Sequence, residues 1–219
     1  MTKAKERYDA LSSTRSQYLK IAEQASELTL PYLVREDETY NRSARNLITP
    51  YQSVGAKGVV TLASKLMLAL LPPQTSFFKL QVDEAMLGQV ADPRIKSELD
   101  LSFSKIERTI LEAIAASDDR VVVHQALKHL VVAGNVLIFM SKDGLKLFPL
   151  NRFVVERDGD GNILEIVTKE RISRKLLETE YGIDPLPPVD VNTDYSNQED
   201  ADIFTYVRRE KGSMVWHQE

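Results

Sequence analysis

Hydrophobic residues are unusually dense between positions 51 and 75. They recur three or four residues apart, as on one face of a helix: Val59, Leu62, Ala63, Leu66, Met67 and Leu70. Further apolar positions widen this stripe, and only four residues form a polar seam: Lys57, Thr61, Ser64 and Lys65. Ser53 is the predicted N-cap, and Pro72-Pro73 ends the pattern because proline lacks the N–H that a helix needs. The pattern predicts a central helix covered on most sides, with Leu66 in the core.

Lipid is a poor candidate for covering this helix. Lys57 and Lys65 lie inside the apolar run, and each costs roughly 2.5–3.5 kcal/mol near the centre of a bilayer. Gly55 and Gly58 each lower helix propensity by about 1 kcal/mol, so their presence indicates that another backbone packs close to the helix there. We therefore expect a central helix of a soluble assembly and no membrane partner.

Further amphipathic helices flank the central one. Sparse apolar positions predict a helix over residues 5–28, and Asp92-Pro93 is a typical opening for a second one. The apolar positions of that helix follow a 4-4-3-4-4 spacing: Ile95, Leu99, Phe103, Ile106, Ile110 and Ile114. Asp118 and Asp119 are expected to end it and to cap a third helix, which Gly134 ends. The predicted inward positions of this third helix are Val123, Ala126, Leu127, Leu130 and Val131.

Residues beyond position 135 favour β-structure. Short apolar or alternating runs cover 136–140, 145–147, 154–157, 163–169, 203–209 and 214–217, and glycine-containing turns separate them at 142–144, 158–161 and 211–212. An isolated strand is also predicted at 77–82. The fold class is therefore α+β: long amphipathic helices followed by an antiparallel β-sheet. The expected division is a mainly helical region, residues 1–134, and an antiparallel β region, residues 135–219.

Composition narrows the class of protein. Hydrophobic residues make up 43% and charged residues 27%, which is ordinary for a soluble globular protein. With a net charge of −4, the chain does not suggest a protein that grips nucleic acid over its whole surface. The absence of cysteine excludes disulfides, thiolate catalysis and cysteine metal sites. The N-terminus leads into a charged helix, so no signal peptide is expected.

A segment from Gly182 to Asp202 is distinctly acidic. It contains six acidic residues and no basic one: Asp184, Asp190, Asp194, Glu199, Asp200 and Asp202. Pro185, Pro187 and Pro188 prevent a continuous helix in the same stretch. We expect an exposed loop that could dock a partner.

Asp158-Gly-Asp160-Gly-Asn162 resembles the start of a calcium loop. An EF-hand loop beginning at Asp158 needs glycine at its sixth position and glutamate at its twelfth, and these places hold Ile163 and Lys169. With β-type runs on both sides, a hairpin turn is the favoured interpretation. His124 and His129 lie roughly 140° apart on a helix, too far to chelate one metal, and are expected on a solvated or intersubunit surface.

Other motif fragments fail in similar ways. Gly55-Ala-Lys-Gly58 lacks the spacing of a phosphate loop, and the Ser102-Phe-Ser-Lys105 pattern of serine acylases lies on a charged helix without partner motifs. Contact with DNA through Lys57, Lys65 and the pair Arg42 and Arg45 has no aromatic platform to support it. We therefore predict no catalytic, cofactor-binding or metal-binding residue, no cofactor, and no enzyme.

Three stretches in order resemble the portal proteins of short-tailed bacteriophages, the head-to-tail connectors at one capsid vertex. The first is Gln52-x-Val-Gly-Ala-Lys-Gly58 with Leu62-Ala-Ser-Lys-Leu-Met-Leu-Ala-Leu-Leu-Pro-x-Gln-Thr75. The second is Ala126-Leu-Lys-His-Leu-Val-Val-Ala-Gly-Asn-Val-Leu137. The third is Lys146-Leu-Phe-Pro-Leu150 with Val154-Val-Glu-Arg-Asp158 and Gly161-Asn-Ile-Leu164.

The resemblance implies the N-terminal part of such a protein, mainly its wing, with the stem, clip and crown lying beyond Glu219. It also implies a homo-oligomeric ring of twelve subunits, non-specific passage of double-stranded DNA, and docking of terminase, tail adaptor and capsid or scaffold proteins. The location would be the portal vertex of the virion, and the host cytoplasm during assembly. Two alternatives remain: a metal-assisted hydrolase using Asp158 and Asp160, and a soluble adaptor that binds a protein through the acidic loop Gly182 to Asp202.

Overall fold

The computed structural model describes residues 3–34, 49–73, 75–81, 93–142, 144–173, 200–210 and 212–219. The helices come first: α1 (Ala4–Thr14), α2 (Ser16–Leu28), α3 (Val54–Leu70), α5 (Pro93–Ala116) and α6 (Asp119–Ala133). The strands follow: β1 (Leu137–Ser141), β2 (Gly144–Phe148), β3 (Phe153–Arg157), β4 (Ile163–Ser173), β5 (Asp200–Glu210) and β6 (Ser213–Gln218), with a short 3₁₀ helix at Leu150–Arg152. The predicted α+β order is confirmed.

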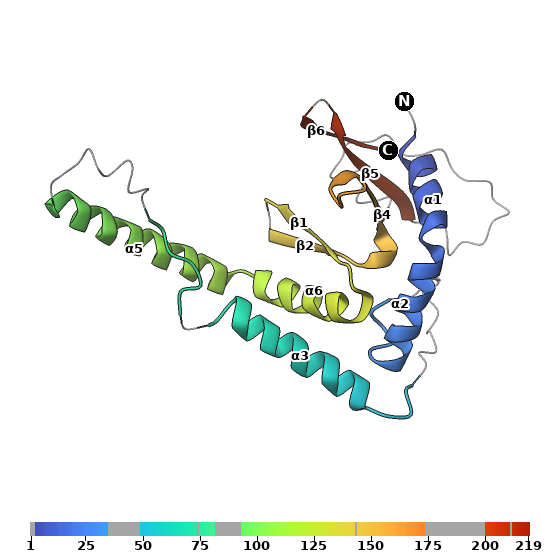
Figure 1. Ribbon diagram of the computed structural model, residues 1–219, viewed down its shortest axis with the longest axis horizontal. Coiled ribbons are helices and arrows are strands. Elements are labelled where there is room, and N and C mark those ends of the chain that lie inside the picture. Colours follow the sequence, from blue (N-terminus) through green and yellow to red (C-terminus); the bar gives the residue numbers. More distant parts are fainter. Residues whose placement is uncertain are drawn as a thin grey trace.

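The predicted single helix over residues 5–28 is wrong, because the helix is interrupted at Arg15. This residue has φ −95° and ψ 3°, outside the helical region. Its guanidinium donates to the backbone carbonyl of Leu150 at 2.5 Å. Because the helix is interrupted there, α1 lies against the strands while α2 packs beside α6 (Figure 1).

Helix α3 has the predicted limits. Ser53 is at the N-cap position but makes no side-chain capping bond, and the helix ends at Leu70, before the prolines. A Cβ atom on Gly55 would lie 2.7 Å from the carbonyl oxygen of Leu28, so the predicted close approach of another backbone is confirmed there. Among the residues that the structure describes, a Cβ on Gly58 would meet nothing within 4 Å, so the expectation fails at that position there.

Helices α5 and α6 also start and end largely as expected. Pro93 is the first residue of α5, while Asp92 lies outside the described residues. Asp118 is at the N-cap position of α6 without a side-chain bond, and Gly134 ends α6 with φ 71°. In α6 the predicted inward residues Ala126 and Leu127 are buried, but Leu130 is 44% exposed, so its placement in the core is wrong.

The strands form two sheets rather than one. β1 and β2 pair as an antiparallel hairpin, and β3, β4, β5 and β6 form a four-stranded antiparallel sheet in sequence order. The predicted glycine turns are present, since Gly144, Gly161 and Gly212 all have positive φ. The strand predicted at 77–82 is wrong: residues 77–81 form no strand, and Val82 lies outside the described residues.

Two hydrophobic cores hold these elements together. One joins α2, α3 and α6 to the start of the β region: Leu19, Ala22, Leu30, Leu33, Val34, Val59, Ala133, Phe148, Leu150 and Phe153. The other lies between α1 and the four-stranded sheet: Ala4, Tyr8, Val154, Val167, Phe204 and Tyr206. Helix α1 is thus packed on the sheet, while the division of the wing at residue 134 stays a prediction.

Candidate functional site

Helix α3 is buried along one narrow face. Val59 and Ala63 are 7% and 0% exposed, and this face packs against α6, which runs beside it (Figure 1). Leu66, the predicted core residue, is only half-buried. The rest of the helix carries large uncovered apolar side chains, namely Val54, Val60, Leu62, Leu68 and Leu70. The prediction of a helix covered on most sides, with Leu66 in its core, is therefore wrong for the part of the chain that the structure describes, which covers α3 on one side.

Helix α5 leaves part of its apolar seam uncovered as well. It continues from α6 and extends away from the four-stranded sheet (Figure 1). Leu99, Phe103 and Ile114 are half-buried, whereas Ile95, Ile106 and Ile110 are exposed. Among the described residues, the predicted seam is thus packed only in part.

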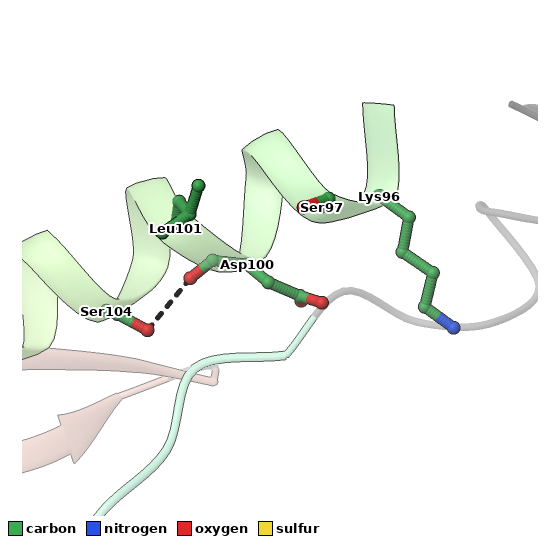
Figure 2. A pocket seen from close by; sticks show the side chains of 5 residues that line it. All are labelled: Lys96, Ser97, Asp100, Leu101 and Ser104. Atoms are coloured by element: carbon green, nitrogen blue, oxygen red, sulfur yellow. Dashed lines mark hydrogen bonds between the residues drawn. The ribbon is translucent and has the colours of Figure 1, made fainter. Parts of the chain in front are cut away.

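The first half of α5 lines an open hollow rather than an enclosed site. Figure 2 shows the side chains that line an open hollow there: Lys96, Ser97, Asp100, Leu101 and Ser104. The Ser104 hydroxyl donates to the Asp100 carbonyl at 2.9 Å, within the helix itself. The hollow is open to solvent rather than a cavity that surrounds a ligand.

A third apolar surface lies on the sheet face opposite α1, where Val155 packs partly against the core of α2, α3 and α6 while β6 is exposed among the described residues. Val155, Ile166, Val207 and Trp216 are paired in register across the four strands, so their side chains share one face. Trp216, on β6, is 67% exposed. Exposed apolar surface of this extent marks contact with other protein, and we define the candidate site as these surfaces of α3, α5 and β6.

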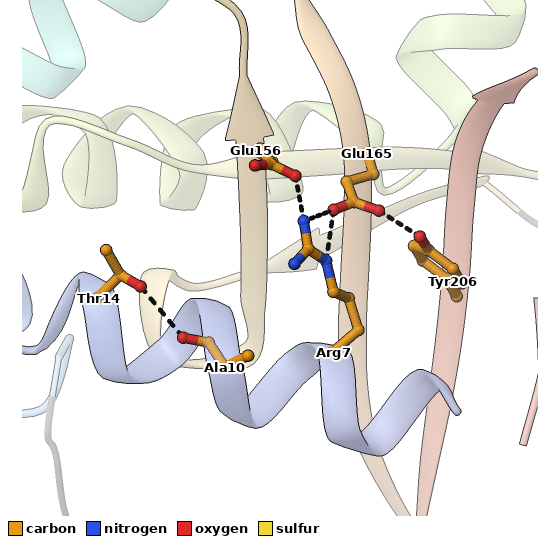
Figure 3. A network of polar contacts seen from close by, with 6 residues as sticks. All are labelled: Arg7, Ala10, Thr14, Glu156, Glu165 and Tyr206. Atoms are coloured by element: carbon orange, nitrogen blue, oxygen red, sulfur yellow. Dashed lines mark hydrogen bonds and ion pairs between the residues drawn. The ribbon is translucent and has the colours of Figure 1, made fainter. Parts of the chain in front are cut away.

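A polar network fixes α1 on the other face of the sheet (Figure 3). The Arg7 guanidinium bonds to the carboxylates of Glu165, on β4, and Glu156, on β3. The Tyr206 hydroxyl donates to the second carboxylate oxygen of Glu165. Tyr8 adds a hydrogen bond from its hydroxyl to the Asn151 carbonyl at 2.8 Å. The sequence analysis missed this network, since its members lie up to two hundred positions apart.

The network shifts the ionisation of its members. Burial alone would raise the pKa of Glu165, but hydrogen bonds involving Glu156, Tyr206 and Arg7 outweigh it and hold that pKa below its ordinary value. The hydrogen bond to Glu165 raises the pKa of Arg7 further. Burial and the same carboxylate raise the pKa of Tyr206. Glu165 is therefore a carboxylate at neutral pH, and it anchors α1 electrostatically.

The Asp158 turn is a hairpin connection between β3 and β4. One Asp158 carboxylate oxygen accepts the backbone N–H of Asp160 at 3.0 Å and of Asn162 at 2.7 Å. The other accepts the Asn162 side-chain amide at 2.9 Å. The hydrogen bond with the Asn162 side chain is the main cause that lowers the pKa of Asp158. Local turn bonding thus accounts for both oxygens, in line with the favoured interpretation.

We expect the Asp158→Asn and Asp160→Asn variants to fold like the parent and to bind no metal. Asparagine at position 158 keeps the oxygen that accepts the two backbone N–H groups and loses only the acceptor of the exposed Asn162 side-chain amide. Calorimetric titration with calcium and magnesium, together with thermal unfolding, checks this. Stoichiometric binding by the parent that is lost in the variants would instead favour the metal-assisted hydrolase.

The two α6 histidines differ from each other. His124 is half-buried, and its Nε2 lies 3.4 Å from the Ser64 hydroxyl of α3; burial and then the nearby Lys128 lower its pKa. His129 is only 7% exposed, so the prediction that it lies on a solvated surface is wrong. Burial also lowers the pKa of His129. Since both groups favour the neutral form, they act as packing residues of α6.

The remaining motif residues fall on ordinary helix surface. Ser102 donates to the Glu98 carbonyl within α5 at 2.8 Å. Lys57 and Lys65 are exposed on α3, while Arg42 and Arg45 lie outside the described residues. Most of the predicted acidic loop also lies outside them. Its end belongs to β5, where Asp202 pairs with Lys169 at 3.2 Å and with Arg171 at 3.0 Å.

Two further features of the described residues bear on the sequence predictions. In that part of the chain, no three His, Cys, Asp or Glu side chains gather in a way that could hold a metal ion. Within the same part, none of the helices combines the length and the apolarity that crossing a membrane requires.

Comparison with known proteins decides the family. The model of a family described as bacteriophage head to tail connecting protein matches residues 1–216. The chain belongs to this family. It is 36% identical to the portal protein of Enterobacteria phage T3, over 93% of this chain and 40% of that protein. It is 38% identical to the portal protein of Escherichia phage T7, over 78% of this chain and 32% of that protein.

Family membership confirms the predicted resemblance to portal proteins of short-tailed phages. A head-to-tail connecting protein is a structural component of the virion, and the prediction of a structural protein rather than an enzyme agrees with the family. The chain spans about two-fifths or less of the length of the portal proteins that it matches. The exposed apolar surfaces described above are therefore found in a chain much shorter than the portal proteins that it matches.

Proposed function

We propose that this chain is the wing part of a portal subunit, and that copies of the subunit form a ring of twelve at the capsid vertex. The observation that supports this proposal is the apolar surface of α3, which the described chain covers on one face only. Each apolar side chain of α3 that is left in water forgoes the favourable free energy of burial. Neighbouring subunits, or other parts of the subunit, would remove that cost.

The location of the uncovered surfaces suits a ring. Subunits of a closed ring meet head-to-tail, so each one presents two different faces to its neighbours. The α3 surface and the β6 surface around Trp216 lie on different elements. Two separate apolar surfaces on one chain are what a heterologous contact requires.

Double-stranded DNA would pass through the ring during packaging and ejection without sequence-specific contacts. The net charge of −4 supports this, because tight binding to phosphates needs a basic surface. Terminase, tail adaptor and capsid or scaffold proteins would dock on the ring. Assembly would take place in the host cytoplasm, and the finished ring would lie at the portal vertex of the virion.

Replacing Leu68 with glutamate in the complete portal protein tests this function. Leu68 is 59% exposed, so the folded chain should tolerate the change. A buried carboxylate between subunits is strongly unfavourable, so rings should be lost. Native mass spectrometry measures the proportions of single subunits and rings. Ser13→Glu, at an exposed position on α1, is the matched control and should leave ring formation intact. Normal rings from Leu68→Glu would remove α3 from the interface.

Residues 1–219 alone should be monomeric or should aggregate. The chain spans about two-fifths or less of the portal proteins that it matches, and by itself it exposes large apolar side chains on α3 and β6. Light scattering coupled to size exclusion measures the mass. A stable twelve-subunit ring of this chain would show that the ring-forming contacts lie within these 219 residues.

A further inference from the structure

The segment between α3 and α5 that the structure describes, residues 71–73 and 75–81, is here named the connector. Pro72 and Pro73 hold their φ angles near one value, so the backbone is stiff where it leaves α3. Further along, the rings of Phe77 and Phe78 meet edge-to-face with centroids 5.2 Å apart. The Ser76 hydroxyl donates to the Phe78 carbonyl. These local contacts hold residues 76–78 of the connector, whose described residues form no strand.

Two charged side chains bond to the connector near its ends. Arg120, on α6, donates from Nη2 to the Leu71 carbonyl at 2.6 Å. Glu107, on α5, accepts the Leu80 backbone N–H at Oε1, also at 2.6 Å. Hydrogen bonds with one ionised partner are stronger than neutral ones. Both charged residues are half-buried, which reduces competition from water.

These bonds matter because the direct junction of α5 with α6 is short. Only Ser117 and Asp118 separate the two helices, and Asp118 has φ −78° and ψ 2°. The Asp119 carboxylate accepts the Leu145 backbone N–H at 2.9 Å and the Ser117 hydroxyl at 2.8 Å. The start of α6 is thereby held to β2. Beyond this point α5 extends away from the four-stranded sheet (Figure 1).

A helix joined to its neighbour through two non-helical residues can change direction by small rotations at those residues. The connector adds a second attachment, because Glu107 lies well along α5 from the junction. Arg120 fixes the other end of the connector where α3 stops. Its cation also meets the negative end of the α3 dipole. The described residues of the connector are thus tied to α6 by Arg120 and to α5 by Glu107.

We propose that the connector sets the direction of α5, with Glu107 and Arg120 as the positioning residues. Loss of either hydrogen bond lets α5 move about Ser117 and Asp118 while its own helix stays formed. The uncovered residues Ile95, Ile106 and Ile110 then no longer point in one fixed direction. All the contacts lie within one chain, so the inference stands whether or not copies form a ring.

Paired spin labels measure the effect directly. The chain has no cysteine, so Ser97→Cys on α5 and Gln125→Cys on α6 give unique label sites, and both positions are exposed. They lie roughly 40 Å apart if the two helices are nearly collinear, at 1.5 Å per residue. Double electron–electron resonance should give one narrow distance distribution. Glu107→Ala and Arg120→Ala should each broaden or shift it.

Glu112→Ala is the matched control, because Glu112 is an exposed α5 glutamate that pairs with Arg108 on the same helix. It should leave the distribution unchanged. Identical distributions for the parent and for both Glu107→Ala and Arg120→Ala would overturn the proposal, as would a parent distribution already as broad as theirs. If circular dichroism shows that Glu107→Ala fails to fold, the double variant Pro72→Gly/Pro73→Gly replaces it. That variant loosens the connector without changing α5, and an unchanged distribution would again overturn the proposal.

Discussion

Glu165→Ala is expected to lower the free energy of unfolding by about 1–3 kcal/mol, the range for leaving a buried hydrogen-bonding group without its partner. The substitution removes the acceptor of both the Arg7 guanidinium and the Tyr206 hydroxyl. Tyr206 is 4% exposed, so its hydroxyl would be left without this partner in the core. Arg7 would keep Glu156, which limits the cost. Urea unfolding followed by circular dichroism measures the change.

The control for this prediction is Glu112→Ala. Glu112 and Arg108 form an exposed pair with side chains 66% and 82% accessible. Such pairs contribute about 0.3–0.5 kcal/mol on a helix, so the variant should unfold almost like the parent. A cost for Glu165→Ala no larger than that of the control would mean that the network does not hold α1 to the sheet.

The same glutamate predicts a pH dependence. The pKa of Glu165 in the folded chain lies below its ordinary value of 4.5, so its contribution to stability is fully present above that value. It is lost as the pH falls through the lower, folded-state pKa. The difference in unfolding free energy between the parent and Glu165→Gln should therefore shrink in acid and stay constant from about pH 6 to pH 8. A difference that grows in acid would contradict the assigned shift.

Local patterns in the sequence were sufficient for most elements of the fold. Pro93, Gly134 and the glycine turns each act on the backbone at their own position, through a fixed φ or a tolerated positive φ. Their effects do not depend on distant residues. The helices and strands bounded by these residues are accordingly near the predicted limits.

The errors occur where distant contacts decide. Arg15 interrupts a pattern that is compatible with one helix, and it bonds to a carbonyl 135 positions away. Residues 77–81 alternate like a strand, but they lie near α5 and bond to Glu107 instead of to a neighbouring strand. His129 is polar by type yet buried by its packing in α6. No spacing rule contains this information.

The candidate site was predictable only in part. The apolar density of residues 54–71 predicted a helix covered on most sides, whereas the described residues cover one face of α3 and leave Leu66 half-buried. The sequence did not show that α6 would cover one face alone. The β6 surface had no comparable signal, since Met214, Val215 and Trp216 read as an ordinary strand. Their exposure depends on β6 lying last in the sheet order.

Gly55→Ala and Gly58→Ala are expected to change stability in opposite directions, although both glycines lie in the first turns of α3. A Cβ at position 55 would lie 2.7 Å from the Leu28 carbonyl oxygen and 3.1 Å from the Thr29 side chain. The nearer atom is backbone, so α2 and α3 would have to separate. Overpacking of this kind costs about 1–3 kcal/mol, and it should exceed the gain in helix propensity.

At position 58 nothing lies within 4 Å of the added Cβ, so only the propensity term remains. Alanine there should stabilise the isolated chain by about 0.5–1 kcal/mol. Urea unfolding of the two variants side by side measures the difference, and each serves as the control for the other. Equal effects would show that Gly55 does not mediate the close approach of α3 to the end of α2. If the chain assembles through α3, Gly58→Ala should in addition weaken ring formation while raising the stability of the single chain. The presence of glycine on this exposed helix face would then be explained by a neighbouring subunit that packs against it.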